Sequence, residues 1–173
     1  MGIPQHGQFF KVSYEKFCEA MQDCFGYKYS GQEQEIYDSV SVPNSRATIG
    51  SAGYDIASPI DFTLRPGESI KFPAGIRIKL DDGWFLACMP RSGLGMKYRL
   101  QLDNTIGIID SDYFFSSNEG QLFFKITNDS RENRTLEVHQ GDRVAQTILM
   151  PFGIVYDDAT AAIRNGGMGS TGL

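Results

Sequence analysis

The fold of this chain is decided by Ser69-Ile70-Lys71-Phe72 and Gly75-Ile76-Arg77-Ile78-Lys79-Leu80, in which apolar and polar side chains alternate. A period of two indicates a β-strand with one buried face, because successive side chains of a strand point to opposite sides. The next run, Trp84 to Met89, is continuously apolar and short enough to be a strand buried on both faces. This part of the chain therefore predicts a β-sheet.

The same pattern continues towards the C-terminus, where residues 122–126, 135–138 and 144–150 predict three more strands. Turn-forming sequences such as Arg65-Pro66-Gly67 and Asp81-Asp82-Gly83 separate the strands. Many short strands without crossover helices are typical of an antiparallel sandwich or barrel. We therefore expect an all-β domain over residues 1–163.

The N-terminal part has a different period. Phe9 to Val12 predicts a first strand, and from Ser13 onwards apolar side chains recur at helical spacing up to Phe25. Ser13 is suited to cap the start of a helix and Gly26 to end it, so we expect a helix over residues 13–25. Its apolar face would pack against the domain or against a neighbouring subunit. Residues 27–45 are expected to form a loop.

Composition limits the function classes. The 173 residues are enough for one domain with a real core, and the formal net charge of −5 gives no global attraction to nucleic acid. Three cysteines without a Cys-x-x-Cys pair and only two histidines argue against a disulfide framework and a zinc site. Without a membrane span or a signal-peptide pattern, the chain is expected to be cytoplasmic and to bind no membrane.

Asp110 directly follows the apolar run Ile106-Gly107-Ile108-Ile109 within the stretch Asn104-Thr105-Ile106-Gly107-Ile108-Ile109-Asp110-Ser111-Asp112-Tyr113. An isolated buried charge is costly, so an aspartate in such a run is either paired, or does chemistry, or closes a turn. The segment alone leaves these alternatives open.

The C-terminal residues 164–173 contain four glycines and begin with Arg164. Such a segment cannot form a rigid core element, and it is either an idle linker or a mobile arm that closes over a ligand. Glycine-rich backbone with a nearby guanidinium is well suited to phosphate oxygens. This chemistry favours the second alternative.

Five segments in order resemble the five motifs of the trimeric dUTP diphosphatase (dUTPase) family. They are residues 46–56, 90–94, 104–113, 141–146 and 164–172. The resemblance implies a jelly-roll β-subunit, a homotrimer in which the arm crosses to a neighbour, and Mg2+-dependent hydrolysis of dUTP to dUMP and pyrophosphate.

The resemblance also implies roles for single residues. Asp110 would activate a water for attack on the α-phosphorus, and Asp55 would hold Mg2+ through water. Tyr113 would pack under the deoxyribose and crowd a 2′-hydroxyl. The remaining substrate-binding residues would be Arg91, Ser92, Gly93 and Gln146 at the phosphates, Asn104, Gly107, Ile108 and Ile109 at the uracil, and Arg164, Met168, Gly169 and Ser170 in the arm.

The chain departs from the family pattern at two places. The segment Phe114 to Glu119 is inserted after Tyr113, and its two phenylalanines need burial. In the arm, Met168 stands where the family usually has a phenylalanine that stacks on uracil, and the Arg-to-Gly spacing is one residue short. Methionine covers a base by dispersion but does not stack as a ring does.

Two other functions fit the same fold. A nucleotide-binding regulatory protein with weak hydrolysis would be consistent with the altered arm and the insertions. The related dCTP deaminase uses a glutamate at a position that aligns roughly with Lys125, so the lysine argues against deamination.

Overall fold

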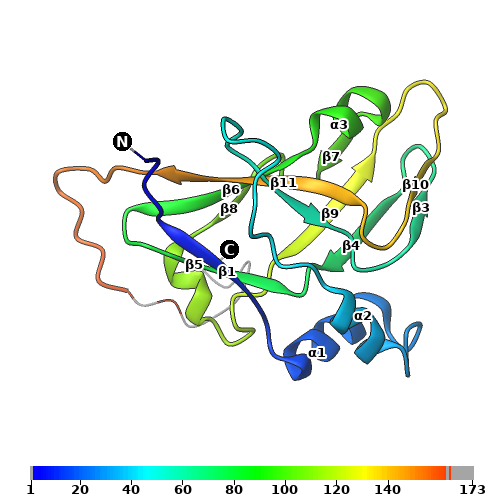
Figure 1. Ribbon diagram of the computed structural model, residues 1–173, viewed down its shortest axis with the longest axis horizontal. Helices are drawn as coiled ribbons and strands as arrows, with labels where there is room; N and C mark the ends of the chain where they lie inside the picture. The colour runs from blue at the N-terminus through cyan, green and yellow to red at the C-terminus, as the bar shows by residue number, and fades with distance from the viewer. Residues whose placement is uncertain (1, 163, 165–173) are drawn as a thin grey trace.

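The computed structural model describes residues 2–162 and Arg164. Eleven strands and four helical segments are present in this part of the chain, in the order shown in Figure 1. The strands are β1 (Gly7–Lys11), β2 (Tyr54–Ala57), β3 (Phe62–Leu64), β4 (Ser69–Pro73), β5 (Ile76–Leu80), β6 (Trp84–Pro90), β7 (Leu100–Leu102), β8 (Gly107–Ile109), β9 (Phe123–Asn128), β10 (Leu136–Val138) and β11 (Arg143–Pro151). The helical segments are α1 (Tyr14–Phe25), α2 (Glu33–Ser39), α3 (Ser92–Tyr98) and the 3-10 helix η1 (Ser111–Phe115).

All strand pairs are antiparallel. The largest sheet has the order β2-β11-β6-β8, a second has the order β4-β9-β7, and β1-β5 and β10-β3 form two-stranded ribbons. This arrangement confirms the all-β antiparallel class that the alternating patterns predict. No helix of the described residues is long and apolar enough to span a bilayer.

The core lies between the sheets. β11 runs through the middle of the largest sheet, and its Val144 and Ala145 are completely buried. Leu86 of β6 and Phe72 of β4 are also completely buried, and Phe72 stacks against Phe62 and Phe124. Burying apolar side chains of this size stabilises the fold by roughly 1.5–3 kcal/mol each.

The predicted N-terminal helix is confirmed as α1. The Ser13 side chain accepts a hydrogen bond from the Lys16 amide, and the chain leaves the helix at Gly26 with a φ of 58°. Its apolar face packs against the domain, because Phe17 is completely buried and Lys71 of β4 pairs with Asp23 at 3.1 Å. In Figure 1 the two N-terminal helices lie together at one end of the molecule.

Three helical segments were missing from the sequence prediction. The predicted loop over residues 27–45 was wrong for residues 33–39, which form α2 with Ile36 as the single buried side chain. α3 follows β6 directly, and η1 follows β8. These segments have only five to seven residues, which is too short for helical periodicity to stand out.

The contact between the N-terminal helices and the sheet can be tested at Gly75, which has a φ of +71°. A Cβ there would lie 2.8 Å from Val40 Cγ2 and 3.3 Å from Phe17 Cδ2. We expect Gly75→Ala to lower the free energy of unfolding by about 1–3 kcal/mol, through backbone strain and crowding. Urea denaturation measures the loss.

The matched control is Gly67→Ala, because Gly67 has a similar φ of +85° but its Cβ would have no neighbour within 4 Å. Backbone strain is then common to both variants, and only crowding differs. Equal losses in the two variants would contradict close packing of the helices at Gly75.

Candidate active site

One cluster of charged side chains lies where β2, β11 and β6 meet. Asp55 of β2 pairs with Arg91 through Oδ1 and Nε at 3.0 Å, and with Arg143 through Oδ2 and Nη1 at 3.3 Å. Arg91 also donates to the Arg143 carbonyl at 3.4 Å. The Asp55 side chain is only 20% exposed, so its charge is held mainly by the two guanidinium groups.

The register of the sheet places the other predicted phosphate ligands beside this cluster. Gln146 of β11 lies opposite Asp55, and its neighbour Ala145 lies opposite Pro90 at the end of β6. Arg91 follows Pro90, and the exposed Ser92 and Gly93 begin α3. The structure therefore brings together three segments that are far apart in the sequence.

A cavity of about 250 Å³ opens next to the cluster. It is lined on one side by Asp55 and Arg143 and on the other by residues 41–47, which connect α2 to β2. Arg46 in this segment donates to the carbonyls of Ile49 and Ser51, which folds the segment back on itself. Residues 41–45 carry no charge and belong to no motif, so the sequence analysis did not place them at the site.

The predicted uracil-binding residues lie in the turn that connects β7 to β8 and in β8 itself, and we call residues 103–109 the uracil loop. Asn104 is exposed at its tip, and Thr105 has a positive φ of 66°. Gly107 is buried against β6, where an added Cβ would lie 3.1 Å from Cys88 Cβ. The uracil loop presents its backbone and the exposed Ile108 to solvent, whereas Ile109 is buried in the core.

Asp110 follows β8 directly and lies under Arg164. The Arg164 Nη2 atom is 2.5 Å from Asp110 Oδ2, and Arg164 Nε is 2.8 Å from Asp112 Oδ1. The guanidinium also lies 5.8 Å from the centre of the Tyr113 ring. Arg164 is 17% exposed although both carboxylates remain about half exposed. The second partner, Asp112, was not among the predicted site residues.

Tyr113 lies in η1 and is 2% exposed. Burial raises the pKa of its phenol, and a hydrogen bond from Asn118 and the charge of Arg164 act in the opposite direction. The hydroxyl donates to the Gln121 carbonyl at 2.8 Å. The ring is therefore fixed at its hydroxyl end, with Arg164 over its face.

The two clusters are far apart within one chain. β6 and β8 are antiparallel, with Cys88 opposite Gly107 and Leu86 opposite Ile109. Arg91 lies three residues beyond Cys88 in one direction, and Asp110 lies three residues beyond Gly107 in the other. Six extended residues span about 20 Å, so Asp110 does not reach the Arg91 cluster of its own chain.

Comparison with known proteins agrees with these motifs. The family model for dUTPase matches residues 39–172. The chain belongs to the dUTPase family. Deoxyuridine 5′-triphosphate nucleotidohydrolases from Laribacter hongkongensis and Tolumonas auensis are 40% and 41% identical over 134 residues, covering 73% of this chain and 85% and 84% of those proteins.

Solved structures of dUTPases have the same fold. The dUTPase from Streptococcus mutans is similar with a TM-score of 0.62 and 26% identity, covering 86% of this chain and 98% of that one. A Staphylococcus bacteriophage 80alpha dUTPase variant with bound dUpNHpp also has a TM-score of 0.62, at 17% identity, over 94% of this chain and 100% of the other. The second likeness concerns the fold alone.

Three predicted arm residues, Met168, Gly169 and Ser170, lie outside the described residues. The inserted phenylalanines after the third dUTPase motif are described. Phe114 packs edge-on against Phe10 of β1 and lies 4.3 Å below the Arg77 guanidinium, whereas Phe115 is 75% exposed. Only one of the two rings is therefore covered, by residues from β1 and β5.

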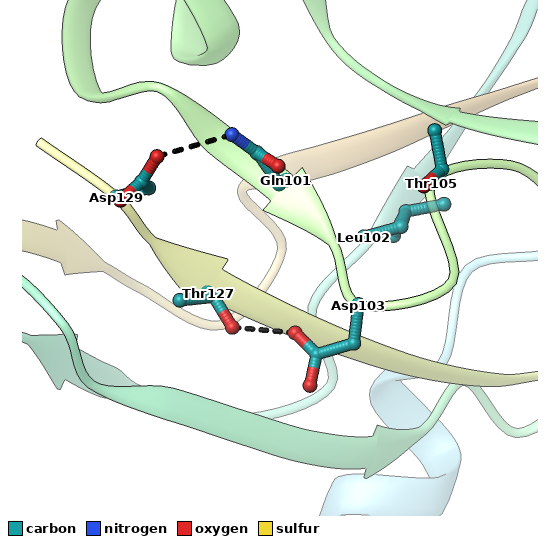
Figure 2. A pocket seen from close by; sticks show the side chains of 6 residues that line it. All are labelled: Gln101, Leu102, Asp103, Thr105, Thr127 and Asp129. Carbon is teal, nitrogen blue, oxygen red and sulfur yellow. Dashed lines mark hydrogen bonds between the residues drawn. The ribbon is translucent and has the colours of Figure 1, made fainter.

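A polar network holds the start of the uracil loop (Figure 2). It lines a cavity of about 320 Å³, in which Gln101 donates to Asp129 at 3.2 Å and Thr127 donates to Asp103. Asp103 also pairs with Lys125 at 2.7 Å. Lys125, which aligns roughly with the glutamate expected in a deaminase, thus holds the uracil loop through Asp103.

The contacts of Asp103 with Lys125 and Thr127 predict that the stability of the protein depends on pH. Hydrogen bonds from Lys125 and then Thr127 hold the pKa of Asp103 below its usual value. A lowered pKa in the folded state adds stability above the usual carboxyl pKa, and this is lost as pH falls through the folded value. Between pH 5 and pH 2, the urea midpoint of the unmodified protein should therefore fall more steeply than that of Asp103→Asn.

Glu137→Gln, which removes an exposed carboxylate from β10, is the matched control and should leave the acid slope unchanged. If Asp103→Asn and the unmodified protein lose stability equally as the pH falls, the charge of Asp103 does not stabilise the uracil loop.

Proposed function

We propose that this protein hydrolyses dUTP to dUMP and pyrophosphate in nucleotide metabolism. The observation that carries the proposal is the ion-paired cluster of Asp55, Arg91 and Arg143 at the sheet edge, in a chain of the dUTPase family. A dense group of guanidinium, hydroxyl and backbone donors in a net acidic protein is suited to a small polyphosphate rather than to a nucleic acid.

The arginine cluster would bind the triphosphate. A guanidinium has five N–H donors, and Arg91 uses Nε for Asp55 and one terminal nitrogen for the Arg143 carbonyl. Donors remain for phosphate, together with the hydroxyl and amide of Ser92, the amide of Gly93 and the side chain of Gln146. Asp55 orients Arg91 and Arg143, so little side-chain freedom is lost when the phosphates bind.

Mg2+ is the proposed cofactor, and Asp55 is the residue that would hold it through water. The described residues contain no group of three metal-binding side chains, and the Asp55 carboxylate is already shared by two guanidinium groups. This donor set fits a hydrated ion that arrives with the phosphates, which is how Mg2+ usually binds in proteins. When bound, the ion would neutralise charge on the phosphates.

The uracil loop and η1 would select the nucleoside. Asn104 and the backbone around Gly107, Ile108 and Ile109 present hydrogen-bonding groups that match the edge of uracil. The Tyr113 ring would lie under the deoxyribose, where it leaves no space for a 2′-hydroxyl. Asp110, placed between these groups, would take the proton from the attacking water as general base.

A complete site would need a second copy of the chain. The roughly 20 Å between Arg91 and Asp110 along the β6–β8 pair supports sites shared between subunits of a homotrimer. The apolar segment after β11 supports it too, because Phe152, Ile154, Val155 and Tyr156 are all at least 49% exposed. In Figure 1 this segment leaves the sheet as an extended loop. The predicted arm over residues 164–173 lies, apart from Arg164, outside the described residues.

The decisive experiment is the release of pyrophosphate from dUTP, dTTP, dCTP and UTP, each with and without Mg2+. We expect release from dUTP to be far faster than release from the other three nucleotides, and to require the ion. Tight dUTP binding without release would instead favour the regulatory protein, and ammonia release from dCTP would favour the deaminase.

Asp110→Asn should lower kcat for dUTP by about 10²–10⁴-fold, the usual contribution of a general base, with dUTP affinity nearly unchanged. Asp112→Asn is the matched control, because Asp112 has a similar contact with Arg164 and similar exposure. Steady-state kinetics and calorimetric binding measure both effects. Equal losses in the two variants would mean that Asp110 acts through Arg164 and not on water.

Shared sites predict complementation between two inactive variants. Asp110→Asn and Arg91→Ala each disable every site when expressed alone. Co-expressed in equal amounts, they should recover about a quarter of the wild-type activity, because each site would draw Asp110 and Arg91 from different subunits at random. No recovery in mixed oligomers, isolated with two affinity tags, would show that both residues act within one chain.

A further inference from the structure

The hydroxyl of Tyr113 is held from two sides, by Asn118 of the inserted segment and by Gln121 just after it. The hydroxyl donates to the Gln121 carbonyl at 2.8 Å and accepts from the Asn118 side-chain amide at 2.9 Å. Both partners come from within eight residues of Tyr113, and the phenol is buried. A buried hydroxyl with both a donor and an acceptor is fixed in direction as well as in position.

Asn118 is itself held in place. Its side-chain oxygen accepts from the Gly120 amide at 3.1 Å, and its carbonyl accepts from the Gln121 amide at 3.2 Å. Gly120 has a φ of +69°, and an added Cβ would lie 2.6 Å from the Tyr113 carbonyl oxygen. The turn therefore closes tightly against Tyr113, and the amide nitrogen of Asn118 is aimed at the hydroxyl.

The segment is also fastened to the rest of the domain. The Glu119 carboxylate accepts from the Ser13 amide at 2.8 Å, where α1 begins, and the Phe114 ring packs against Arg77 and Phe10. These contacts come from β1, β5 and the start of α1. The inserted segment is thus a rigid brace behind Tyr113.

We propose that Asn118 is a positioning residue that sets the discrimination between 2′-deoxyribose and ribose. This rests on the proposed function, in which the Tyr113 ring lies under the sugar. Asn118 does not touch the substrate; it acts by fixing the hydroxyl end of the ring. A steric barrier against a 2′-hydroxyl works only if the ring cannot yield, so discrimination depends on what holds the ring.

Removal of the Asn118 amide should therefore affect the wrong substrate more than the right one. dUTP does not press on the ring, whereas UTP gains from any freedom of the ring to move. In Asn118→Ala we expect the ratio of kcat/KM for dUTP to that for UTP to fall about fivefold, which is the usual net contribution of one hydrogen bond. kcat for dUTP should change less than twofold.

The experiment is a double-mutant cycle with Asn118→Ala, Tyr113→Phe and the double variant, measured as kcat/KM for dUTP and UTP. Tyr113→Phe keeps the ring and removes the hydroxyl with both of its hydrogen bonds, so it should lower the ratio at least as much as Asn118→Ala. The double variant should be no worse than Tyr113→Phe alone, because that substitution already removes the contact with Asn118. Ser117→Ala, an exposed position in the same segment, should leave the ratio unchanged.

An unchanged ratio in Asn118→Ala, with normal dUTP turnover, would overturn the positioning role and leave the proposed function standing. Equal losses for both substrates together with a lower melting temperature would also overturn it, by showing a purely structural role. If the unmodified protein releases no pyrophosphate from dUTP, the proposed function fails and this inference fails with it.

Discussion

The antiparallel ladder through β11 is the constraint on which the rest of the structure depends. β11 pairs with β2 on one side and with β6 on the other, and its Val144 and Ala145 are completely buried. Its register fixes Gln146 opposite Asp55 and carries Arg143 to the same carboxylate. Three motifs that are spread over about a hundred residues of sequence thereby converge at one edge of the sheet.

The same antiparallel geometry also separates Asp110 from the Arg91 cluster within one chain. β8 runs antiparallel to β6, so Asp110, which follows β8, lies towards the N-terminal end of β6. Arg91 follows the C-terminal end of β6. Rearranging loops cannot remove this separation, because it is set by strand length and hydrogen-bond register. Under the proposed function, oligomerisation would thus be tied to the chemistry through the sheet itself, and the exposed apolar residues after β11 would form part of the partner surface.

The alternating patterns predicted seven of the eleven strands of the described residues because alternation directly reflects burial, and the caps predicted α1. The strands β2, β3, β7 and β8, which have only three or four residues each, were not predicted. The sequence analysis also missed α2, whose seven residues bury only Ile36 and lack a side-chain cap. That Asp55 is the acid which pairs with both Arg91 and Arg143 was not predicted, because partners 36 and 88 residues away meet only through the sheet register. Asp55 was expected to hold a metal ion, and the ion pairs give it a second task. The roles of Phe114 and Asn118 needed the structure, since a loop sequence does not indicate what it braces.

The position of Arg164 bears on how a ligand would enter. Its guanidinium pairs with Asp110 and Asp112 and lies over the Tyr113 ring, so it covers both the proposed base and the proposed sugar platform. Under the proposed function a nucleotide must displace it from the ring face. A triphosphate carries more charge than two half-exposed carboxylates and accepts bidentate hydrogen bonds from a guanidinium, so it offers Arg164 a better partner. Exchange of one set of oxygens for the other would uncover Asp110 only when phosphates are present, which would couple the availability of the base to the binding of the substrate.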